Sequence, residues 1–470
     1  MKCIRSIRVI VPTIVLLLVA TAISLKSLPS ASGAQMENSY IMVGPQWGDA
    51  QTAAVAAADG IVTFIHPQTG IGMATSSAPD FLPRALASGQ FTSGAIDQAV
   101  QWGPADPDTP QIEAAITPGD ETFINAQWNI KAVEAAGAWA AGIDGSGVRV
   151  AVIDGGIYNA HRDLADNIDV AASRSFVPGF AFNEDVGTFW HGTHVAGIIA
   201  AEDNAFGTIG IAPKATIIGV KALHNGSGTF GAVIASLLYA STPLSEGGAG
   251  ADIINMSLGA TFARGGGNTG AGPLIAALNK AVNFAGQNSL VVSAAGNNGL
   301  DLDNSGSVIS VPAESGSGIA VSATGPVGYA VGYPNGATNF RRLASYTNFG
   351  NSAIWVAAPG GDGVLPSTAL CSIPEAPVGT ITAPCAVFDF VLSTVRGSGS
   401  NTTTYGFAAG TSMAAPAASA VAALIKQRFP GISVGELKNR LAQTADDEGK
   451  PGHDPAYGRG FVNARRAATE

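Results

Sequence analysis

The sequence predicts an α/β fold with three layers, in which a mostly parallel central sheet lies between two layers of helices. Short apolar runs occur at positions 148–154, 215–222, 251–259 and 289–297. Alanine-rich stretches of helical length separate these runs, and apolar strands that alternate with helices are typical of a parallel sheet covered on both faces. The chain has 470 residues and is 46% hydrophobic, which allows one large domain and a smaller one.

Three polar residues mark the edge of this sheet where function is expected. In open α/β sheets, functional residues gather at the carboxyl ends of the strands. Asp154, Ser257 and Asn297 each stand where an apolar run ends. The sequence therefore predicts a site along this edge.

A smaller α+β unit is predicted upstream, at about residues 38–98. Its expected strands are 39–43, 61–66 and 71–75, and its expected helices are 50–58 and 79–87. The polar, proline-rich stretch 102–119 that follows is typical of an exposed linker.

The first 34 residues have the pattern of a signal peptide. Residues 1–8 are basic, residues 9–25 are almost entirely apolar, and residues 32–34 are small, so we expect cleavage before Gln35. An uncleaved membrane anchor is the alternative, although the apolar run is short for a span and Pro12 interrupts it. The pattern predicts a secreted, extracellular protein with no stable membrane insertion after cleavage.

Charge and cysteine content narrow the function further. The formal net charge is −10 and the chain has no basic block, which argues against binding nucleic acid because phosphate contacts need clustered lysine and arginine. Cys371 and Cys385 form an even pair once Cys3 leaves with the signal segment. In an oxidising compartment, a Cys371–Cys385 disulfide would close a loop of about 15 residues and contribute roughly 3 kcal/mol. Two unrelated buried thiols are the alternative.

Two segments suggest a general base and its partner. The apolar strand through residues 148–154 ends on Asp154, whose carboxylate can accept the Nδ1 proton of a histidine. His191 and His194 open an apolar helix in the segment HGTHVAG, and either is a candidate general base. Plainer alternatives exist, since Asp154 can begin a turn and one histidine can be structural. Zinc ligation by Asp154, His191 and His194 is a different functional interpretation.

A third segment, GTSMAAP at 410–416, places Ser412 at the start of an alanine-rich helix. The helix dipole supplies positive potential there, and the backbone N–H of Ser412 points to where an oxyanion would form. Asn297, in the run AAGNNG, is a candidate side-chain donor to the same oxyanion. The alternatives are a helix cap for Ser412 and an ordinary turn for Asn297.

Four segments in this order, VAVIDGGI, HGTHVAG, SAAGNNG and GTSMAAP, resemble those of the subtilisin-like serine proteases. The resemblance covers residues 127–468 and implies a three-layer subtilisin-like fold for residues 124–470. It implies a secreted serine endopeptidase that cleaves polypeptide substrates through an acyl-enzyme. The implied triad is Asp154, His191 and Ser412, with Asn297 as oxyanion donor. A zinc-dependent hydrolase and a non-catalytic peptide-binding protein on a protease scaffold are the alternatives.

The resemblance also implies where a substrate and a calcium ion bind. The implied substrate cleft, made of two chain edges and a pocket, comprises Gly226, Ser227, Gly228, Ser257, Leu258, Gly259, Ala294, Gly296 and Ser310. The segment between HGTHVAG and GIAP has the length and polarity of the family's calcium loop. Its implied ligands are Asn204, the carbonyls of Glu202, Phe206 and Thr208, and the side chains of Asp163 and Gln127. A polar loop without metal is the alternative.

Residues 35–100 resemble the family's amino-terminal prodomain, a small α+β ferredoxin-like domain that assists folding and blocks the cleft. This implies a zymogen whose own prodomain is an intramolecular inhibitor, with a processing site in the linker at 101–123. Two positions depart from the family pattern. Gly155 stands where Ser or Thr is usual, and Ala417 stands where His is common. Neither change removes a catalytic group, so we expect activity.

Overall fold

The computed structural model describes residues 37–103, 111–112, 123–184, 191–264, 271–366, 368–375, 379–397 and 403–470. The expected signal peptide at residues 1–34 and most of the expected linker at 101–123 lie outside these ranges. Within them, no helix has both the length and the apolar character needed to cross a membrane.

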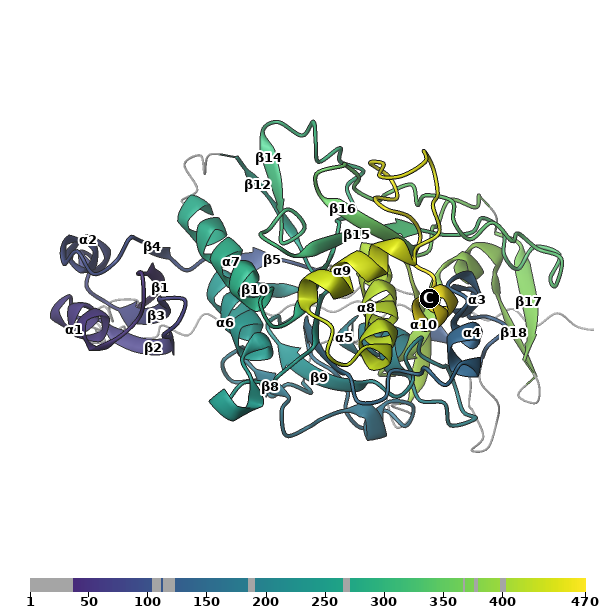
Figure 1. The fold of residues 1–470 in the computed structure, drawn as a ribbon, viewed down its shortest axis with the longest axis horizontal. Helices are drawn as coiled ribbons and strands as arrows, with labels where there is room; N and C mark the ends of the chain where they lie inside the picture. Colours follow the sequence, from purple (N-terminus) through teal and green to yellow (C-terminus); the bar gives the residue numbers. More distant parts are fainter. Residues whose placement is uncertain are drawn as a thin grey trace, which may run out of the picture. The chain divides into compact units, whose positions relative to one another are not determined.

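A seven-stranded sheet forms the middle layer of the larger domain (Figure 1). Its strands are β7 (Arg149–Asp154), β8 (Arg174–Ser175), β9 (Thr216–Lys221), β11 (Ile253–Met256), β13 (Leu290–Ala294), β15 (Ile319–Thr324) and β16 (Ile354–Pro359). Their order is β16-β15-β13-β11-β7-β9-β8, and every neighbouring pair is parallel. The expected parallel sheet is confirmed.

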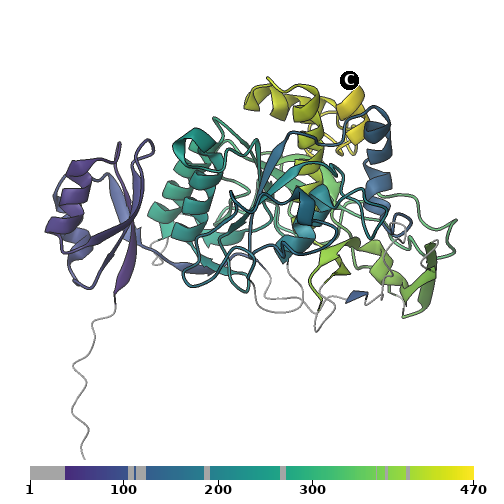
Figure 2. The same ribbon diagram turned by 90° about the horizontal axis from the view of Figure 1, so that it is seen from below.

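Helices cover both faces of this sheet. They are α3 (Trp128–Ala132), α4 (Ala135–Ala140), α5 (His191–Ala200), α6 (Phe230–Ser241), α7 (Ala271–Ala285), α8 (Thr411–Arg428), α9 (Val434–Gln443) and α10 (Ala464–Thr469). One hydrophobic core contains residues of α5 and α8, and the other contains residues of α6 and α7 (Figures 1 and 2). In β7, Val150 and Val152 belong to the first core, whereas Ala151 and Ile153 belong to the second. Burial on both faces explains the continuous apolar runs.

Shorter strands complete the larger domain. They are β10 (Ser227–Thr229), the antiparallel pair β12 (Ala260–Ala263) and β14 (Val308–Val311), and a sheet of β19 (Val391–Val395), β20 (Thr404–Ala408) and β6 (Gln111–Ile112). β20 leads directly to α8 and therefore fixes where that helix begins.

The amino-terminal unit is a four-stranded antiparallel sheet with two helices. Its elements are β1 (Asn38–Val43), α1 (Asp49–Ala57), β2 (Ile61–His66), β3 (Ile71–Ser76), α2 (Phe81–Ala87) and β4 (Ser93–Ile96). The strand order β2-β3-β1-β4 is the ferredoxin-like order that the family resemblance implied. All five expected elements are present within two residues of their predicted ends, and β4 is an addition that the sequence pattern did not indicate.

The two faces of the amino-terminal sheet pack on different partners. Tyr40 and Met42 belong to a small core that includes residues of α1 and α2. The alternate residues belong to the core that contains α6 and α7, namely Ile41, Val43, Ile71 and Met73. Asp97 Oδ1 accepts a 3.0 Å hydrogen bond from Gly231 N in the first turn of α6, where a carboxylate is favourable.

The expected exposed linker is not exposed at its first residue. Trp102 is only 2% exposed, because its indole ring packs against Phe230 in an edge-to-face contact with centroids 4.9 Å apart. The polar and proline-rich composition after Trp102 gave no indication that this residue is buried.

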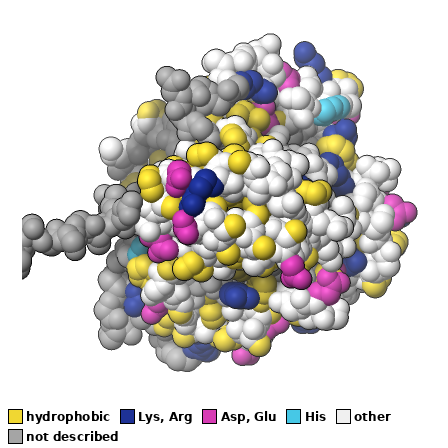
Figure 3. Space-filling view, turned by 90° about the vertical axis from the view of Figure 1, so that its left-hand side faces the viewer, with side chains coloured by type: hydrophobic (Ala, Val, Ile, Leu, Met, Phe, Trp, Pro, Cys, Tyr) yellow, Lys and Arg dark blue, Asp and Glu magenta, His cyan; other side chains and the backbone are white. Residues whose placement is uncertain are grey.

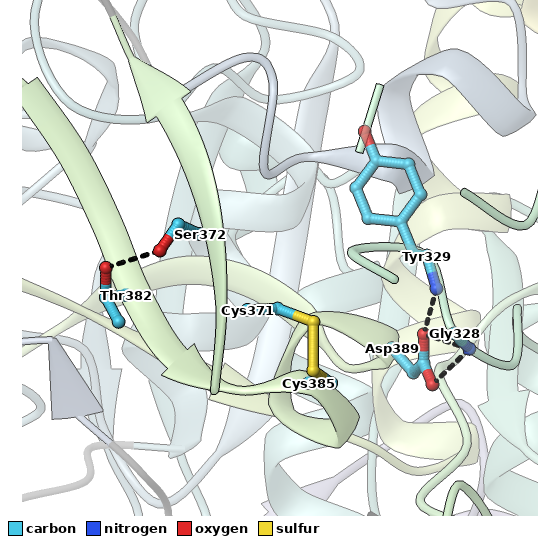
Figure 4. Close-up of a disulfide and its surroundings, with 7 residues drawn as sticks. All are labelled: Gly328, Tyr329, Cys371, Ser372, Thr382, Cys385 and Asp389. Carbon is cyan, nitrogen blue, oxygen red and sulfur yellow. Dashed lines mark hydrogen bonds between the residues drawn. A yellow bond between two sulfur atoms is a disulfide. The ribbon is translucent and has the colours of Figure 1, made fainter. Parts of the chain in front are cut away.

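A disulfide-bonded hairpin lies between β16 and β19 in the sequence. Its strands are β17 (Leu370–Glu375) and β18 (Gly379–Pro384), which pair antiparallel. The bond between Cys371 and Cys385 confirms the expected disulfide, and a hydrogen bond between the Ser372 and Thr382 hydroxyls crosses the hairpin beside it (Figure 4).

Charged side chains are dispersed on the face drawn in Figure 3. Single Lys, Arg, Asp and Glu side chains lie among hydrophobic and other residues there. This distribution agrees with a composition that is only 12% charged.

The contact between α5 and β19 yields a stability prediction. A β-carbon added to Gly197 would lie 2.2 Å from Thr394 Oγ1 and 2.4 Å from Ser393 Oγ, which donate hydrogen bonds to backbone carbonyls of α5. In a Ser412→Ala background, Gly197→Ala should lower the free energy of unfolding by about 1–3 kcal/mol. Denaturant titration measures this change.

The matched control is Gly435→Ala in α9. A β-carbon at Gly435 meets nothing within 4 Å, so the substitution should stabilise the protein by up to about 1 kcal/mol through helix propensity. Equal effects of the two substitutions would contradict the packing argument.

Candidate active site

Asp154 and His191 form a close pair at the carboxyl edge of the central sheet. Asp154 is the last residue of β7 and is 2% exposed, and His191 is the first residue of α5. His191 Nδ1 lies 2.9 Å from both carboxylate oxygens of Asp154. Gly155 N donates a 2.7 Å hydrogen bond to Asp154 Oδ1, which helps to fix the carboxylate. The pairing places the Nδ1 proton on the Asp154 side and turns Nε2 away from it.

Gly192 allows α5 to approach this carboxylate, and Gly156 allows residues 182–184 to approach the turn after β7. A β-carbon on Gly192 would lie 2.3 Å from Gly156 O and 3.1 Å from Asp154 Cβ. Gly156 has φ 129°, and a β-carbon there would meet the carbonyl oxygens of Phe182 and Glu184 at about 3 Å. Because the obstructing atoms are mostly backbone, larger residues would push His191 away from Asp154.

Ser412 occupies the first turn of α8 and is 7% exposed. Pro416 has no N–H, so the carbonyl of Ser412 lacks the helical hydrogen bond from four residues ahead. The hydroxyl of Ser257 supplies the missing bond to Ser412 O at 2.7 Å. Ser412 Oγ donates to Ser257 O at 3.2 Å. The segment after β11 therefore holds both the backbone and the side chain of Ser412.

His191, Asn297 and Ser412 line one cavity of about 650 Å³. The candidate base, the candidate nucleophile and the candidate oxyanion donor therefore line the same cavity. The hydroxyl hydrogen bond of Ser412 to Ser257 O is the interaction observed without substrate, and catalytic hydrogen bonds often tighten only when substrate binds.

Asn297 is oriented by Thr411. Asn297 Oδ1 accepts hydrogen bonds from Thr411 N at 2.9 Å and Thr411 Oγ1 at 2.8 Å, which turns its Nδ2 amide the other way. A β-carbon on Gly410 would lie 3.4 Å from Asn297 Nδ2 and 3.6 Å from Ser412 N. Asn297 Nδ2 and Ser412 N therefore both lie close to this position. The sequence pattern did not indicate this role of Thr411, and its position directly before Ser412 was the available signal.

The expected substrate residues separate into two groups. Leu258, Gly259, Ala294, Gly296 and Ser310 line the cavity. The other four are not among the lining residues. Ser227 and Gly228 are in β10, Gly226 directly precedes it, and Ser257 is hydrogen-bonded to Ser412.

The chain's own segment 99–103 lies between the two expected substrate edges. β5 (Ala99–Gln101) pairs antiparallel with β10. Trp102 N donates to Gly226 O at 2.9 Å on one side, and Gly259 N donates to Trp102 O at 2.7 Å on the other. Residues 100–103 are among those that line the cavity. This segment therefore hydrogen-bonds to both of the chain edges that the family resemblance implied for a substrate.

The indole ring of Trp102 anchors this segment. Its Nε1–H donates to Gly228 O at 3.0 Å, and its ring packs near Phe230 and also near Phe262, with centroids 6.2 Å apart in the second case. A buried tryptophan whose N–H is hydrogen-bonded combines a large apolar contact with a fixed orientation.

His194 has a structural place, and the zinc alternative is not supported. Its Nε2 lies 3.1 Å from the carbonyl oxygens of Val391 and Gly406, and burial lowers the pKa of His194 to about 3, with His191 adding to the effect. Among the residues that the structure describes, no group of three or more His, Cys, Asp or Glu side chains is arranged to hold a metal.

The expected calcium residues lie around a turn after α5. Asp163 is fully buried, and its Oδ2 accepts hydrogen bonds from Thr208 N at 2.8 Å and Thr208 Oγ1 at 3.1 Å. Burial raises the pKa of Asp163 well above its ordinary value. Gln127 departs from the expectation, because its Oε1 accepts from Ile209 N at 3.0 Å and its Nε2 donates to Ile209 O at 2.9 Å.

Comparison with known proteins places this geometry in a family. Residues 145–460 match the Subtilase family, Peptidase_S8. Subtilisin Savinase of Lederbergia lenta is 34% identical over 343 residues, which are 72% of this chain and 97% of that protein. An alkaline protease of Shouchella clausii is 34% identical over 378 residues, 78% of each chain.

A solved structure shares the fold. The epidermin leader peptide processing serine protease EpiP of Staphylococcus aureus has a TM-score of 0.68 at 20% identity, over 92% of this chain and 98% of that one. With the matched residues, the parallel sheet and the site at its carboxyl edge in agreement, this chain belongs to the subtilase family of serine endopeptidases.

Proposed function

We propose that this protein hydrolyses peptide bonds with Ser412 as nucleophile, His191 as general base and acid, and Asp154 as the residue that orients His191. The observation that carries the proposal is the 2.9 Å approach of His191 Nδ1 to both carboxylate oxygens of Asp154, beside a cavity that Ser412 shares. This pairing fixes the tautomer in which Nε2 can accept a proton.

The reaction follows from these positions. His191 Nε2 takes the Ser412 hydroxyl proton as Oγ attacks the scissile carbonyl carbon, and Asp154 stabilises the resulting imidazolium. The negative oxygen is bound by Ser412 N–H and Asn297 Nδ2, whose orientation Thr411 maintains. The imidazolium protonates the leaving amine, and water activated by His191 then hydrolyses the acyl-enzyme.

Residues 35–100 act, on this proposal, as a prodomain that inhibits the enzyme from within the same chain. Support comes from segment 99–103, which hydrogen-bonds to Gly226, Gly228 and Gly259 along the cleft. A substrate peptide would need the same backbone groups, so it cannot bind in this register until the segment leaves. Processing in the linker would release a mature enzyme.

A calcium ion fits most of the residues expected to hold it. Asp163 is buried beside the Tyr405 hydroxyl, and its carboxylate can serve as a cation ligand. Asn204 and the carbonyls of Glu202, Phe206 and Thr208 would add oxygen donors, the ligand type that calcium prefers. Gln127 is already bonded to Ile209 through both amide atoms, so we omit it from the proposed set.

We further propose that the protein is exported and acts outside the cell. The signal-like residues 1–34 and the Cys371–Cys385 disulfide, which suits an oxidising compartment, support this location.

The first prediction from the proposed function concerns the nucleophile. Ser412→Ala should abolish both peptide cleavage and covalent labelling by a fluorophosphonate, whereas Ser433→Ala, at the amino-terminal cap of α9, should leave both intact. Cleavage of a peptide substrate and gel detection of the labelled protein measure the two effects. Persistent cleavage by Ser412→Ala would sink the proposal.

Two other results would redirect the assignment. Loss of activity with a chelator, while a serine-directed reagent leaves the protein active, would restore the zinc alternative. Absence of any acyl-enzyme in the processed wild type would favour a non-catalytic peptide-binding protein.

The second prediction concerns the oxyanion donor. Asn297→Ala should lower kcat by about a hundred- to a thousandfold with little change in KM, because its amide acts on the developing charge. Asn298→Ala, at the exposed neighbouring position, is the control. Steady-state kinetics that show a change confined to KM would contradict the assigned role.

The third prediction concerns Trp102. In the full-length precursor, Trp102→Ala removes the indole hydrogen bond to Gly228 O and the contact with Phe230, so the cleft should open more often. A fluorophosphonate should then label Ser412 faster than in the unprocessed wild type. Ile96→Ala, whose side chain is exposed on β4 upstream of the segment, should label at the wild-type rate. Equal labelling of Trp102→Ala and wild type would show that this segment does not block the cleft.

A further inference from the structure

The disulfide-bonded hairpin meets the start of the larger domain at a buried carboxyl group. Glu375, the last residue of β17, is 1% exposed. Its Oε1 accepts a 2.7 Å hydrogen bond from Ala126 N, and its Oε2 accepts a 3.3 Å hydrogen bond from Asn125 N. The Asn125 side chain donates in return to Pro374 O at 3.0 Å. Pro374 and Glu375 of the hairpin therefore hydrogen-bond to Asn125 and Ala126, about 250 positions earlier in the chain.

A second contact grips the carbonyl side of Asn125. Tyr329 donates its hydroxyl hydrogen bond to Asn125 O at 2.5 Å, and Lys131 Nζ donates to the same hydroxyl oxygen at 2.9 Å. The backbone N–H groups of Gly328 and Tyr329 donate to the carboxylate of Asp389, which closes the short helix that begins at Cys385 (Figure 4). The disulfide thus joins β17, which contacts Asn125 through Glu375, to the short helix, which contacts Asn125 through Asp389 and Tyr329.

The residues on either side of Asn125 are docked on the loop after α5. Phe123 is 1% exposed, stacks edge-to-face on Tyr405 with centroids 5.2 Å apart, and donates its N–H to Gly207 O. Gln127 binds both backbone groups of Ile209. Without the hairpin, the backbone N–H of Asn125 would lose its acceptor between these two attachments, and the N–H of Ala126 would keep only its 3.1 Å hydrogen bond to Phe123 O.

We propose that the Cys371–Cys385 hairpin is a clamp for the first residues of the catalytic domain, 123–127, and keeps them docked on the loop 206–209. The docking does not depend on the proposed function, but its consequence does: after the linker is cut, the clamp protects the new amino-terminal end from fraying and from further trimming. Burial raises the pKa of Glu375 to about 7, while the two N–H groups, Lys131 and the Asn125 side chain act in the opposite direction. A neutral amide at this position keeps one oxygen that can accept a hydrogen bond from Asn125 N or Ala126 N, so Glu375→Gln should retain part of the clamp.

Hydrogen exchange in the uncut precursor tests the docking. In the Ser412→Ala chain, Glu375→Ala should speed exchange of the amides in residues 123–127 by roughly ten- to a hundredfold, as expected for loss of hydrogen bonds to an ionisable group. Glu375→Gln should fall between Glu375→Ala and the parent. Glu448→Ala, which removes a carboxylate bound to Arg341 at 2.7 Å elsewhere, should leave these amides unchanged. Unchanged exchange in Glu375→Ala would overturn the proposal.

Two further measurements keep the proposal open to refutation if Glu375→Ala does not fold. Reduction of the disulfide in the Ser412→Ala parent should raise exchange in the same residues, and no change would overturn the role of the disulfide. Mass spectrometry of the processed active enzyme over time should show a constant amino-terminal end at or before Phe123 in wild type and trimming beyond Phe123 in Glu375→Gln. A chain that is never processed would contradict the proposed function and leave the exchange result valid.

Discussion

α8 is buried from Thr411 to Ile425 between α5 and the central sheet, so its position is fixed by contacts on every side. Small side chains make this possible, and polar bonds set the register: Ser419 Oγ donates to Asn255 Oδ1 at 3.0 Å, and Asn255 Nδ2 donates to Ser257 Oγ at 2.9 Å. Ser257 then bonds to Ser412 at the helix start. The proposed nucleophile is held by the same contacts that hold the core together.

The proposed base reaches the same place from another element. Because the strands are parallel, their carboxyl ends lie at one edge of the sheet. Asp154, the last residue of β7, and Asn297, in the segment after β13, both lie at this edge. α5 begins at His191 and can approach closely because Gly192, which faces Gly156 O and Asp154 Cβ, lacks a side chain. The site therefore depends on backbone proximity, which few other residues would allow.

Local patterns predicted most of this arrangement. The apolar runs predicted the parallel sheet, because burial on both faces leaves a continuous hydrophobic signature, and the segments around Asp154, His191 and Ser412 carried the family resemblance. The pattern did not separate the roles of His191 and His194, since only the carbonyls of Val391 and Gly406, far along the chain, distinguish them.

Features that depend on distant partners escaped prediction. β4 is four residues long and includes Ser93 and Gly94, so its sequence lacks the pattern of a strand. It is a strand because it pairs with β1. Trp102 lay in a stretch with the composition of a linker, and its pocket is formed by residues more than a hundred positions later. Glu375 had no sequence signal, because its partners Asn125 and Ala126 follow from tertiary contact alone.

The chain segment in the cleft also bears on how activity develops with time. While residues 99–103 are covalently joined to the rest of the chain, their effective concentration at the cleft does not depend on the total protein concentration. On the proposed function, a single cut in the linker would convert this into an equilibrium between two molecules, and the packing of Ile41 and Met73 in the core that contains α6 and α7 would still favour the bound state. Release then requires dilution or destruction of the freed piece, and each liberated enzyme can destroy more of it. Activity in such a population would begin with a lag and then rise steeply, faster at high enzyme concentration.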